Sequence, residues 1–484
     1  MKLKEGDKKT LFKRNSFKTK IVQFGEGNFL RAFIGHTVDE INAISDLKLG
    51  IAVVQPIANG LVEKLEQQGG AYTLFLNGIV DGKDIEEKKL IQNIVSTHDP
   101  YKDFNDFLAL AKNPDVDYII SNTTEAGILF NKSDLFEDKP QKNFPAKLTR
   151  FLWERFTHFE GDANKGFHFL PCELINHNAD QLRNCILKYI ALWGLSSNFR
   201  DWIEQHNLFH NTLVDRIVPG YPKENSDSYK NQIPYTDELM VTAEPFYLWV
   251  VEDDGSLANK LPLDQIDLNI ELVTDMQPYR TRKVRILNGA HTTLVPLSIL
   301  YGHQTVSDIF SDDFTFDFLI NAVLHEIVPT LTMSTEELNT FANQVFDRFK
   351  NPYIKHYLSS IALNSISKFK VRVLPSLLEY QKQYGRLPIY LTFAMACLLR
   401  FYKGFNNGEE LPIKDDPEVV QFIQTAWEEK DMNHFLKNVL GNDLFWGIDL
   451  SVNKTLFSQL SIALEYIEDY ELADAFLTYK LKFE

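Results

Sequence analysis

Short apolar runs in the first half of the chain alternate with stretches of helical periodicity. Four β-rich runs are candidates for strands buried on both faces: TKIVQF (19–24), GIAVVQPI (50–57), VDYIIS (116–121) and FHFLPCELI (167–175). Strands of this kind, separated by helices, predict a parallel sheet with helices on both faces. Right-handed crossovers then give a doubly wound α/β domain with its ligand crevice at the carboxyl ends of the strands.

The pattern changes after the loop PKENSDSYKNQIPY (222–235), which is rich in Pro, Ser, Asn and Lys. The β-rich runs fade there, and from about Asp275 the apolar positions follow helical spacing, as in TRKVRILNGAHTTLVPLSILYG (281–302). The sequence therefore predicts a Rossmann-like nucleotide-binding domain over residues 1–272 and a mainly α-helical substrate and catalytic domain over residues 273–484.

Composition narrows the class of protein. The 484 residues carry a formal net charge of −16, and such an acidic surface repels nucleic-acid phosphates and anionic lipid. No apolar run approaches the 18 or so residues of a membrane span. The three cysteines, Cys172, Cys185 and Cys397, have neither metal-binding nor redox spacing, and a sparse odd count favours a reducing compartment. We expect a cytoplasmic, metal-free protein that acts on a small molecule as a monomer or small homo-oligomer.

The first chemical motif is FGEGNFLRAF (24–33), directly after a predicted buried strand. Glycine at 25 and 27 would let a pyrophosphate approach the backbone, and the next helix offers free N–H groups. Leu30 replaces the usual third glycine, so a plain strand–helix turn remains the alternative, and Arg31 could bind a phosphate or face solvent. The candidate cofactor-binding residues here are Val22, Gln23, Phe24, Gly25, Glu26, Gly27, Asn28, Phe29, Leu30, Arg31 and Ala32.

Two further strand ends would line the same crevice. The acid that usually binds the adenosine ribose is missing after the second strand, where Gln55 stands instead. The charge at this position therefore does not decide between NAD and NADP, although the lack of a following arginine favours NAD. SNTTEAG (121–127) ends a third strand, so Thr123 is a cofactor candidate, with an ordinary loop as the alternative.

The second chemical motif is RKVRILNGAH (282–291). On an α-helix Lys283, His291 and Asn288 would lie at about 0°, 80° and 140°, within one half of the surface. For Lys283 to act as a base, its pKa must fall by about 3 from about 10.4, which corresponds to about 4 kcal/mol. Desolvation and the like charges of Arg282 and Arg285 could supply this. The alternative is a surface lysine, a capping asparagine and a core histidine.

Together these motifs resemble the mannitol dehydrogenase family, the polyol-specific long-chain dehydrogenases. LVDRIVP (213–219) is similar to that family's Val-Asp-Arg segment, and PCELINHN (171–178) to its Cys-Asp-Asn-x3-Asn segment. Lys-x4-Asn-x2-His at 283–291 matches its catalytic helix in spacing and residue type. The resemblance runs from about residue 18 to beyond residue 375 and implies an NAD-dependent oxidoreductase.

Within the family, the closest likeness is to members that reduce tagaturonate. Leu174 stands where mannitol and mannonate dehydrogenases have asparagine, and SIALNSISKFKVRVLPSLL (360–378) is similar to the tagaturonate-reducing branch. That resemblance implies interconversion of D-tagaturonate and D-altronate in hexuronate catabolism. The alternatives are a fructuronate (mannonate) or mannitol oxidoreductase of the same family, and a catalytically silent nucleotide-binding protein.

The resemblance also implies roles for single residues. Lys283 would be the general acid and base, Asn288 and Asn178 would donate hydrogen bonds to the reacting oxygen, and His291 would orient it. No metal is needed, because the amine and amides replace a Lewis acid. A uronate carboxylate calls for a cation, and Ser360 replaces a family arginine. The candidate cations are Arg282, Lys368, Lys370 and Arg372, each of which could instead be solvent-exposed.

Overall fold

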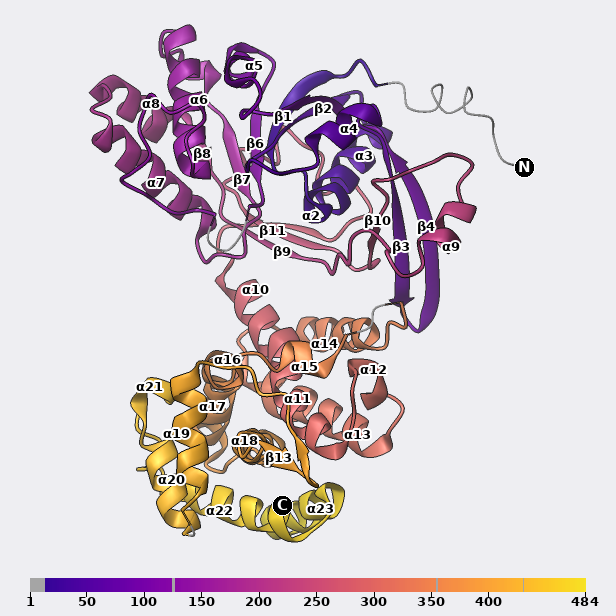
Figure 1. Ribbon diagram of the computed structural model, residues 1–484, viewed down its shortest axis with the longest axis vertical. Helices are drawn as coiled ribbons and strands as arrows, with labels where there is room; N and C mark the ends of the chain where they lie inside the picture. Colours follow the sequence, from indigo (N-terminus) through magenta and orange to yellow (C-terminus); the bar gives the residue numbers. More distant parts are fainter. Residues whose placement is uncertain (1–13, 124–126, 354–355, 430) are drawn as a thin grey trace. The chain divides into compact units, whose positions relative to one another are not determined.

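The computed structural model describes residues 14–123, 127–353, 356–429 and 431–484 (Figure 1). The chain divides into an N-terminal unit, residues 1–78 and 84–276, and a C-terminal unit, residues 79–83 and 277–484. Of the predicted loop SNTTEAG, residues 124–126 lie outside the described part of the chain.

Six parallel strands form the central sheet of the N-terminal unit, in the order β5-β2-β1-β6-β7-β8. The strands are β1 (Lys18–Phe24), β2 (Leu49–Val54), β5 (Ile94–His98), β6 (Tyr118–Ser121), β7 (His168–Pro171) and β8 (Leu208–Phe209). Counted within this sheet alone, the order is 3-2-1-4-5-6, the doubly wound order, and it reverses between β1 and β6. The predicted Rossmann-like sheet is confirmed, and its ligand crevice belongs at the carboxyl ends of β1, β2 and β6.

Alternate residues of β1 enter two separate cores, as expected for a strand that is covered on both faces. Ile21 packs with Leu30 and Phe33. Val22 and Phe24 belong to the opposite core, which the later helices of this unit complete. The α-helices described in the unit are α2 (Asn28–Ala32), α3 (Ile34–Ile44), α4 (Val62–Gln67), α5 (Phe104–Ala109), α6 (Phe144–His158), α7 (Asn178–Leu192), α8 (Ser197–His206) and α9 (Ser226–Asn231).

Two three-stranded sheets complete the β-structure of this unit, in the orders β10-β3-β4 and β12-β11-β9. Three of these strands follow the loop at 222–235, so the β-character continues where the sequence pattern predicted that it fades. The strands are β3 (Tyr72–Val80), β4 (Lys83–Ile91), β9 (Thr212–Asp215), β10 (Val241–Ala243), β11 (Leu248–Glu252) and β12 (Ile270–Val273).

The C-terminal unit is mainly helical, as predicted, and two of its helices are buried on nearly all sides. These are α11 (Gly289–Tyr301) and α18 (Ile389–Phe401), which pack against each other at the centre of the unit. The other helices of four or more residues are α10 (Gln277–Arg282), α12 (Val306–Ile309), α13 (Asp313–Asn321), α14 (Thr335–Phe349), α15 (Leu358–Ile361), α16 (Ser365–Arg372), α17 (Leu374–Tyr384), α19 (Pro417–Trp427), α20 (Met432–Leu440), α21 (Asp443–Trp446), α22 (Lys454–Asp469) and α23 (Leu472–Phe483), with π-helices at Lys283–Asn288 and Ala322–Ile327.

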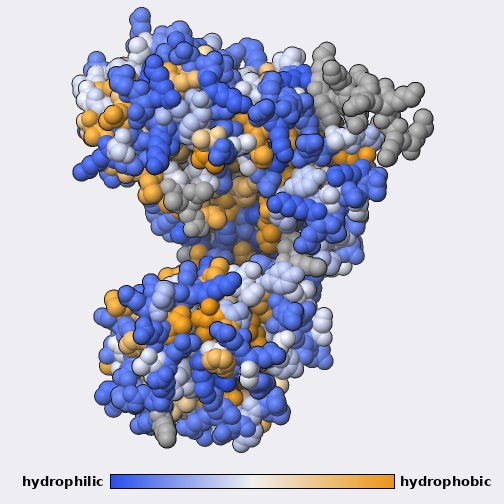
Figure 2. Space-filling view, viewed as in Figure 1, coloured by the Kyte–Doolittle hydropathy of each residue, from blue (hydrophilic) through white to orange (hydrophobic). Residues whose placement is uncertain are grey.

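The visible surface of both units is mostly hydrophilic (Figure 2). Within the described residues, no helix combines the length and apolarity that spanning a bilayer requires. The same residues contain no cluster of three or more His, Cys, Asp or Glu side chains arranged to hold a metal ion.

A buried carboxylate binds the N-terminal end of the central helix α18. Glu326 lies in the second π-helix, and its two oxygens accept hydrogen bonds from the backbone N–H groups of Tyr390 (3.0 Å) and Leu391 (2.8 Å). Burial raises the pKa of Glu326 to about 7, although these two N–H groups favour its charged form.

This carboxylate makes stability depend on pH. Its pKa in the folded protein lies above the ordinary 4.5, so its stabilising contribution is complete below pH 4.5 and is lost as the pH rises through about 7. From pH 4.5 to pH 8 we expect the free energy of unfolding to fall by about 2–4 kcal/mol relative to Glu326→Gln, which cannot ionise. Urea titrations at both pH values measure this difference. An identical pH dependence in the two proteins would contradict the assignment.

Candidate active site

The glycine turn follows β1 at the reversal point of the central sheet. Gly25 has φ +123°, a conformation that favours glycine, and its N–H donates to the carbonyl of Val54 at the end of β2 (3.0 Å). A Cβ added at Gly27 would meet no atom within 4 Å. The turn therefore holds the backbone against the neighbouring strand and leaves open space at Gly27, which suits the close approach of a pyrophosphate.

Arg31, a candidate phosphate ligand, is committed to the protein itself. Its guanidinium is buried and donates to the carbonyls of Glu26 (3.2 Å) and Leu239 and to the side chain of Asn28 (2.7 Å). Neither alternative from the sequence, a phosphate ligand or an exposed residue, describes this arrangement. Arg31 instead fixes the shape of the turn.

The remaining residues of the turn segment also face mainly inward. Gln23 donates from its Nε2 to the carbonyl of Gly25 at 2.7 Å, which closes the turn from inside. Phe29 stacks on Phe33 with ring centroids 4.9 Å apart. The side chains that belong to the apolar core are those of Val22, Phe24, Leu30 and Ala32. These apolar side chains are therefore not available to a cofactor, whereas the backbone groups of the turn are.

The polar residues at the ends of β2 and β6 are hydrogen-bonded to the protein: Gln55 to its own loop, and Thr123 to a residue that follows β7. The Oε1 of Gln55 accepts from the N–H of Val62 (3.4 Å), and its Nε2 donates to the carbonyl of Ala58 (3.3 Å). Thr123 donates from its N–H and its hydroxyl to the buried carboxyl of Glu173 (3.0 and 3.1 Å). The structure thus brings Gln55 and Thr123 to the same edge of the sheet as the glycine turn.

Asn178 differs most from its expected role. Its Nδ2 donates to the carbonyls of Pro171 (2.8 Å), Glu173 (3.1 Å) and Thr212 (3.1 Å), while its Oδ1 accepts from the N–H of Thr212 (3.0 Å) and of Ala179 (2.9 Å). The side chain is 0% exposed, and both of its N–H bonds are used. Asn178 therefore ties β7, α7 and β9 together and has no donor left for a substrate oxygen.

The Val-Asp-Arg segment serves the framework as well. Arg216 donates to the carbonyls of Glu244 (2.9 Å) and Ala32 (2.8 Å), and its guanidinium lies over the ring of Tyr247. Burial lowers the pKa of Arg216 to about 10. Because Ala32 is the last residue of α2, this contact anchors the helix that follows the glycine turn.

Lys283, Asn288 and His291 lie on one continuous helix of the C-terminal unit, but its first part is not an α-helix. Residues Lys283–Asn288 form a π-helix, in which each N–H bonds to the carbonyl five residues earlier. Lys283 and Asn288 are five residues apart, which is about one turn of a π-helix. Their side chains are therefore separated by a smaller angle around the helix axis than the 140° predicted for an α-helix. His291 follows Asn288 by three residues, so the two are neighbours on the helix surface. All three are half-buried.

His291 sits in a desolvated and basic environment. Its ring stacks on Phe349 with centroids 4.0 Å apart and meets the ring of His356 at 5.2 Å, edge to face. Burial holds the pKa of His291 well below its usual range, and the four ionisable groups with the largest effect on it are all basic: His356, Arg348, Arg372 and Lys368. His291 is therefore neutral near pH 7, and its buried Nε2 has no hydrogen-bond partner within the described residues.

Two of the four candidate cations lie together, and the other two lie elsewhere. Lys368 and Arg372 are four residues apart on α16 and so share one helix face. The positive charges of both lower the pKa of His291. Their pKa values are both lowered, chiefly by burial. Lys370 is on another side of α16, where it donates to the carbonyl of Leu444 (3.3 Å). The guanidinium of Arg282 lies 5.0 Å from the ring centroid of Tyr279 and 4.5 Å from that of Phe341.

Close helix packing holds Arg372 beside the start of α11, the helix that carries His291. A Cβ added at Gly289 would lie 3.2 Å from the carbonyl oxygen of Arg372, so glycine lets the end of α16 approach the start of α11. Arg372 also donates to the hydroxyl of Thr292 (3.4 Å). Sequence reasoning missed Arg348 and His356, because they lie more than 55 residues beyond the motif and no spacing connects them to it.

Two family models cover most of the chain. The mannitol dehydrogenase Rossmann domain matches residues 19–265, and the mannitol dehydrogenase C-terminal domain matches residues 275–468. Altronate oxidoreductase of Bacillus subtilis (strain 168) is 44% identical over 462 residues, 95% of each chain. Altronate oxidoreductase of Yersinia enterocolitica is 42% identical over 474 residues, 97% of this chain and 98% of that protein.

Two solved structures resemble the whole chain. The ternary complex of Pseudomonas fluorescens mannitol 2-dehydrogenase with NAD and D-mannitol gives a TM-score of 0.69 at 21% identity, covering 100% of both chains. Substrate-free D-sorbitol dehydrogenase gives a TM-score of 0.82 at 21% identity, covering 98% of this chain and 100% of the other. At this identity the likeness concerns the fold.

Proposed function

The chain belongs to the mannitol dehydrogenase family, and from this premise we propose that it is an NAD-dependent oxidoreductase that interconverts D-tagaturonate and D-altronate. The named relatives at 42% and 44% identity support the sugar-acid substrate. The tagaturonate/altronate pair further implies a place in hexuronate catabolism.

The glycine turn fits a nicotinamide dinucleotide. The reversal of strand order, the positive φ of Gly25 and the open space at Gly27 provide the backbone approach that a pyrophosphate needs. NAD, when bound, supplies or accepts the hydride. The residues proposed to hold it are those of the turn itself, with Gln55 and Thr123 at the neighbouring strand ends.

Proton transfer is assigned to the C-terminal unit. During reduction, the ammonium of Lys283 gives its proton to the substrate's carbonyl oxygen as that oxygen gains negative charge, and during oxidation the neutral amine takes it back. Asn288 donates a hydrogen bond to the same oxygen. His291, kept neutral by its surroundings, uses its free Nε2 to orient a substrate hydroxyl without adding another charge. Asn178 is left out of this proposal, because its amide is fully used.

One observation supports the choice of an acidic substrate: the ionisable groups that act most strongly on the half-buried His291 are all basic. Lys368 and Arg372 share one face of α16 and both lower the pKa of His291, and burial disfavours the charge on both. A substrate carboxylate would relieve that cost, and a guanidinium can bind it through two parallel hydrogen bonds. A neutral polyol offers no such compensation.

The proposal is tested with a panel of substrates. Purified protein with NADH should consume tagaturonate at a higher kcat/KM than fructuronate or fructose, followed by the loss of NADH absorbance. Faster consumption of fructuronate would assign the chain to mannonate oxidation instead. Binding of NADH without turnover of any of the three would favour a silent nucleotide-binding protein.

The position of the cofactor is tested at Gly27. We expect Gly27→Asp to weaken NADH binding at least about tenfold, because its carboxylate would face the pyrophosphate. Gly27→Ala adds the same Cβ without charge, in space where no atom lies within 4 Å, and should bind NADH nearly normally. Fluorescence titration gives both dissociation constants. Equal affinities for the two variants would place the cofactor elsewhere.

A further inference from the structure

The adenosine ribose of a dinucleotide is usually held by an acid at the end of the second strand of the sheet, and this chain has no acid there. Gln55, which follows β2, makes its hydrogen bonds to its own loop, to the N–H of Val62 and the carbonyl of Ala58. Its carboxamide therefore shapes the loop after β2. Another group must supply the negative charge if the ribose site is to distinguish NAD from NADP.

Glu26, the middle residue of the glycine turn, brings a carboxylate to this place. Its Oε1 accepts a hydrogen bond from the N–H of Leu61 (3.2 Å), in the loop after β2. The same oxygen lies 2.1 Å from the position of a Cβ added at Gly60, and the Oε1 of Gln55 lies 2.6 Å from that position. Glycine at 60 thus makes room for Glu26 directly beside Gln55. The side chain of Glu26 is buried, at 7% exposure.

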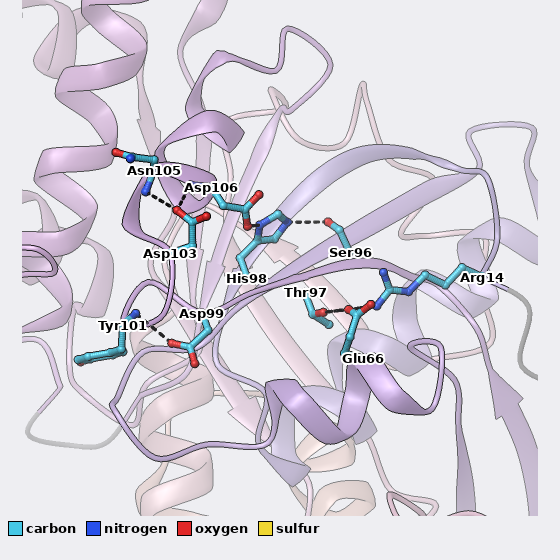
Figure 3. A network of polar contacts seen from close by, with 10 residues as sticks. All are labelled: Arg14, Glu66, Ser96, Thr97, His98, Asp99, Tyr101, Asp103, Asn105 and Asp106. Atoms are coloured by element: carbon cyan, nitrogen blue, oxygen red, sulfur yellow. Dashed lines mark hydrogen bonds and ion pairs between the residues drawn. The ribbon is translucent and has the colours of Figure 1, made fainter.

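A second carboxylate stands on the next loop. Asp99 directly follows β5, which pairs with β2, and its Oδ1 accepts from the N–H of Tyr101 (2.9 Å; Figure 3). The two loops are joined, since the N–H of Gln55 donates to the carbonyl of His98 (3.0 Å) and the hydroxyl of Tyr101 to that of Pro56 (3.2 Å). Repulsion from Asp99 contributes to the raised pKa of Glu26, after the larger effect of burial.

We propose that Glu26, supported by Asp99, replaces the missing strand-end acid: its carboxylate accepts a hydrogen bond from the 2′-hydroxyl of NAD and repels the 2′-phosphate of NADP. A carboxylate that reaches across from the glycine turn does what an acid after β2 does in other doubly wound domains. The inference rests on the proposed use of a nicotinamide dinucleotide and adds which of the two cofactors the site selects, and by which residue.

The selectivity is measured as the ratio of dissociation constants for NADPH and NADH, by calorimetry on the full chain at pH 8. We expect the wild type to favour NADH, and Glu26→Gln, which keeps an acceptor for the N–H of Leu61, to reduce that ratio about 10- to 100-fold. Adding Asp99→Asn should reduce it further. A Glu26 that only braced the loop would weaken both nucleotides equally and leave the ratio unchanged, which would overturn the inference.

Asp115→Asn is the matched control. Asp115 pairs with Lys18 at the start of β1, the opposite end of the strand from the glycine turn, so this loss of one negative charge should leave the ratio as it is. Should Glu26→Gln fail to fold, the 2′-deoxyadenosine analogue of NADH tests the wild type directly. We expect it to bind about tenfold more weakly than NADH, and equal affinity would overturn the inference. A wild type that binds neither NADH nor NADPH would overturn the proposed function as well.

Discussion

Replacing Lys283 by alanine is expected to lower kcat for tagaturonate reduction by about 10²–10⁴, the range that general acid–base catalysis contributes. The amine is the proposed proton donor, and it lies one π-turn from Asn288 on the same helix. NADH binding should not change, because the proposed cofactor residues belong to the N-terminal unit. Stopped-flow NADH oxidation and NADH titration measure the two effects separately.

Lys382→Ala provides the control for Lys283. Lys382 is an exposed lysine of α17 that interacts with Glu379, so its loss removes the same charge and volume from the C-terminal unit. Its variant should retain wild-type kcat. Normal turnover by Lys283→Ala would remove the lysine from the mechanism, and equal losses in both variants would point to a general effect of charge.

Replacing Arg372 by methionine is expected to lower kcat/KM for tagaturonate about 10- to 100-fold, because a charge-assisted hydrogen bond to the carboxylate is lost. Arg372 and Lys368 lie four residues apart on one face of α16, and both lower the pKa of His291. Lys370→Met removes one positive charge from another side of the same helix and should leave kcat/KM nearly unchanged. Steady-state kinetics of the two variants make the comparison, and similar values for both would refute the carboxylate site.

The central sheet could be predicted largely because its strands are buried on both faces. β2, β6 and β7 are buried along their whole length and β1 over its last four residues, and the sequence identified all four. β8 has only two residues, and β5 (IVSTH) is mostly polar, so neither gave a comparable signal. The later strands β10 to β12 are three to five residues long and lie among loops, which explains why the β-pattern seemed to end early.

The sequence identified the candidate site residues but not the contacts that their side chains make. The motif at 283–291 is found from spacing, yet α-helical geometry placed Asn288 too far around the helix, since periodicity carries no sign of a local π-helix. Arg31 and Asn178 looked like ligands because they are polar residues in the right motifs. Both are nearly or fully buried, and their donors bind backbone carbonyls, which only the folded chain reveals.

The pH dependence of reduction tests the central claim most directly. In single turnovers with enzyme in excess over tagaturonate and saturating NADH, the wild-type rate should fall tenfold per pH unit above the pKa of the Lys283 ammonium, because reduction needs that proton. The slow residual rate of Lys283→Ala should lack this decline. A decline at the same pH in both proteins would show that some other group delivers the proton.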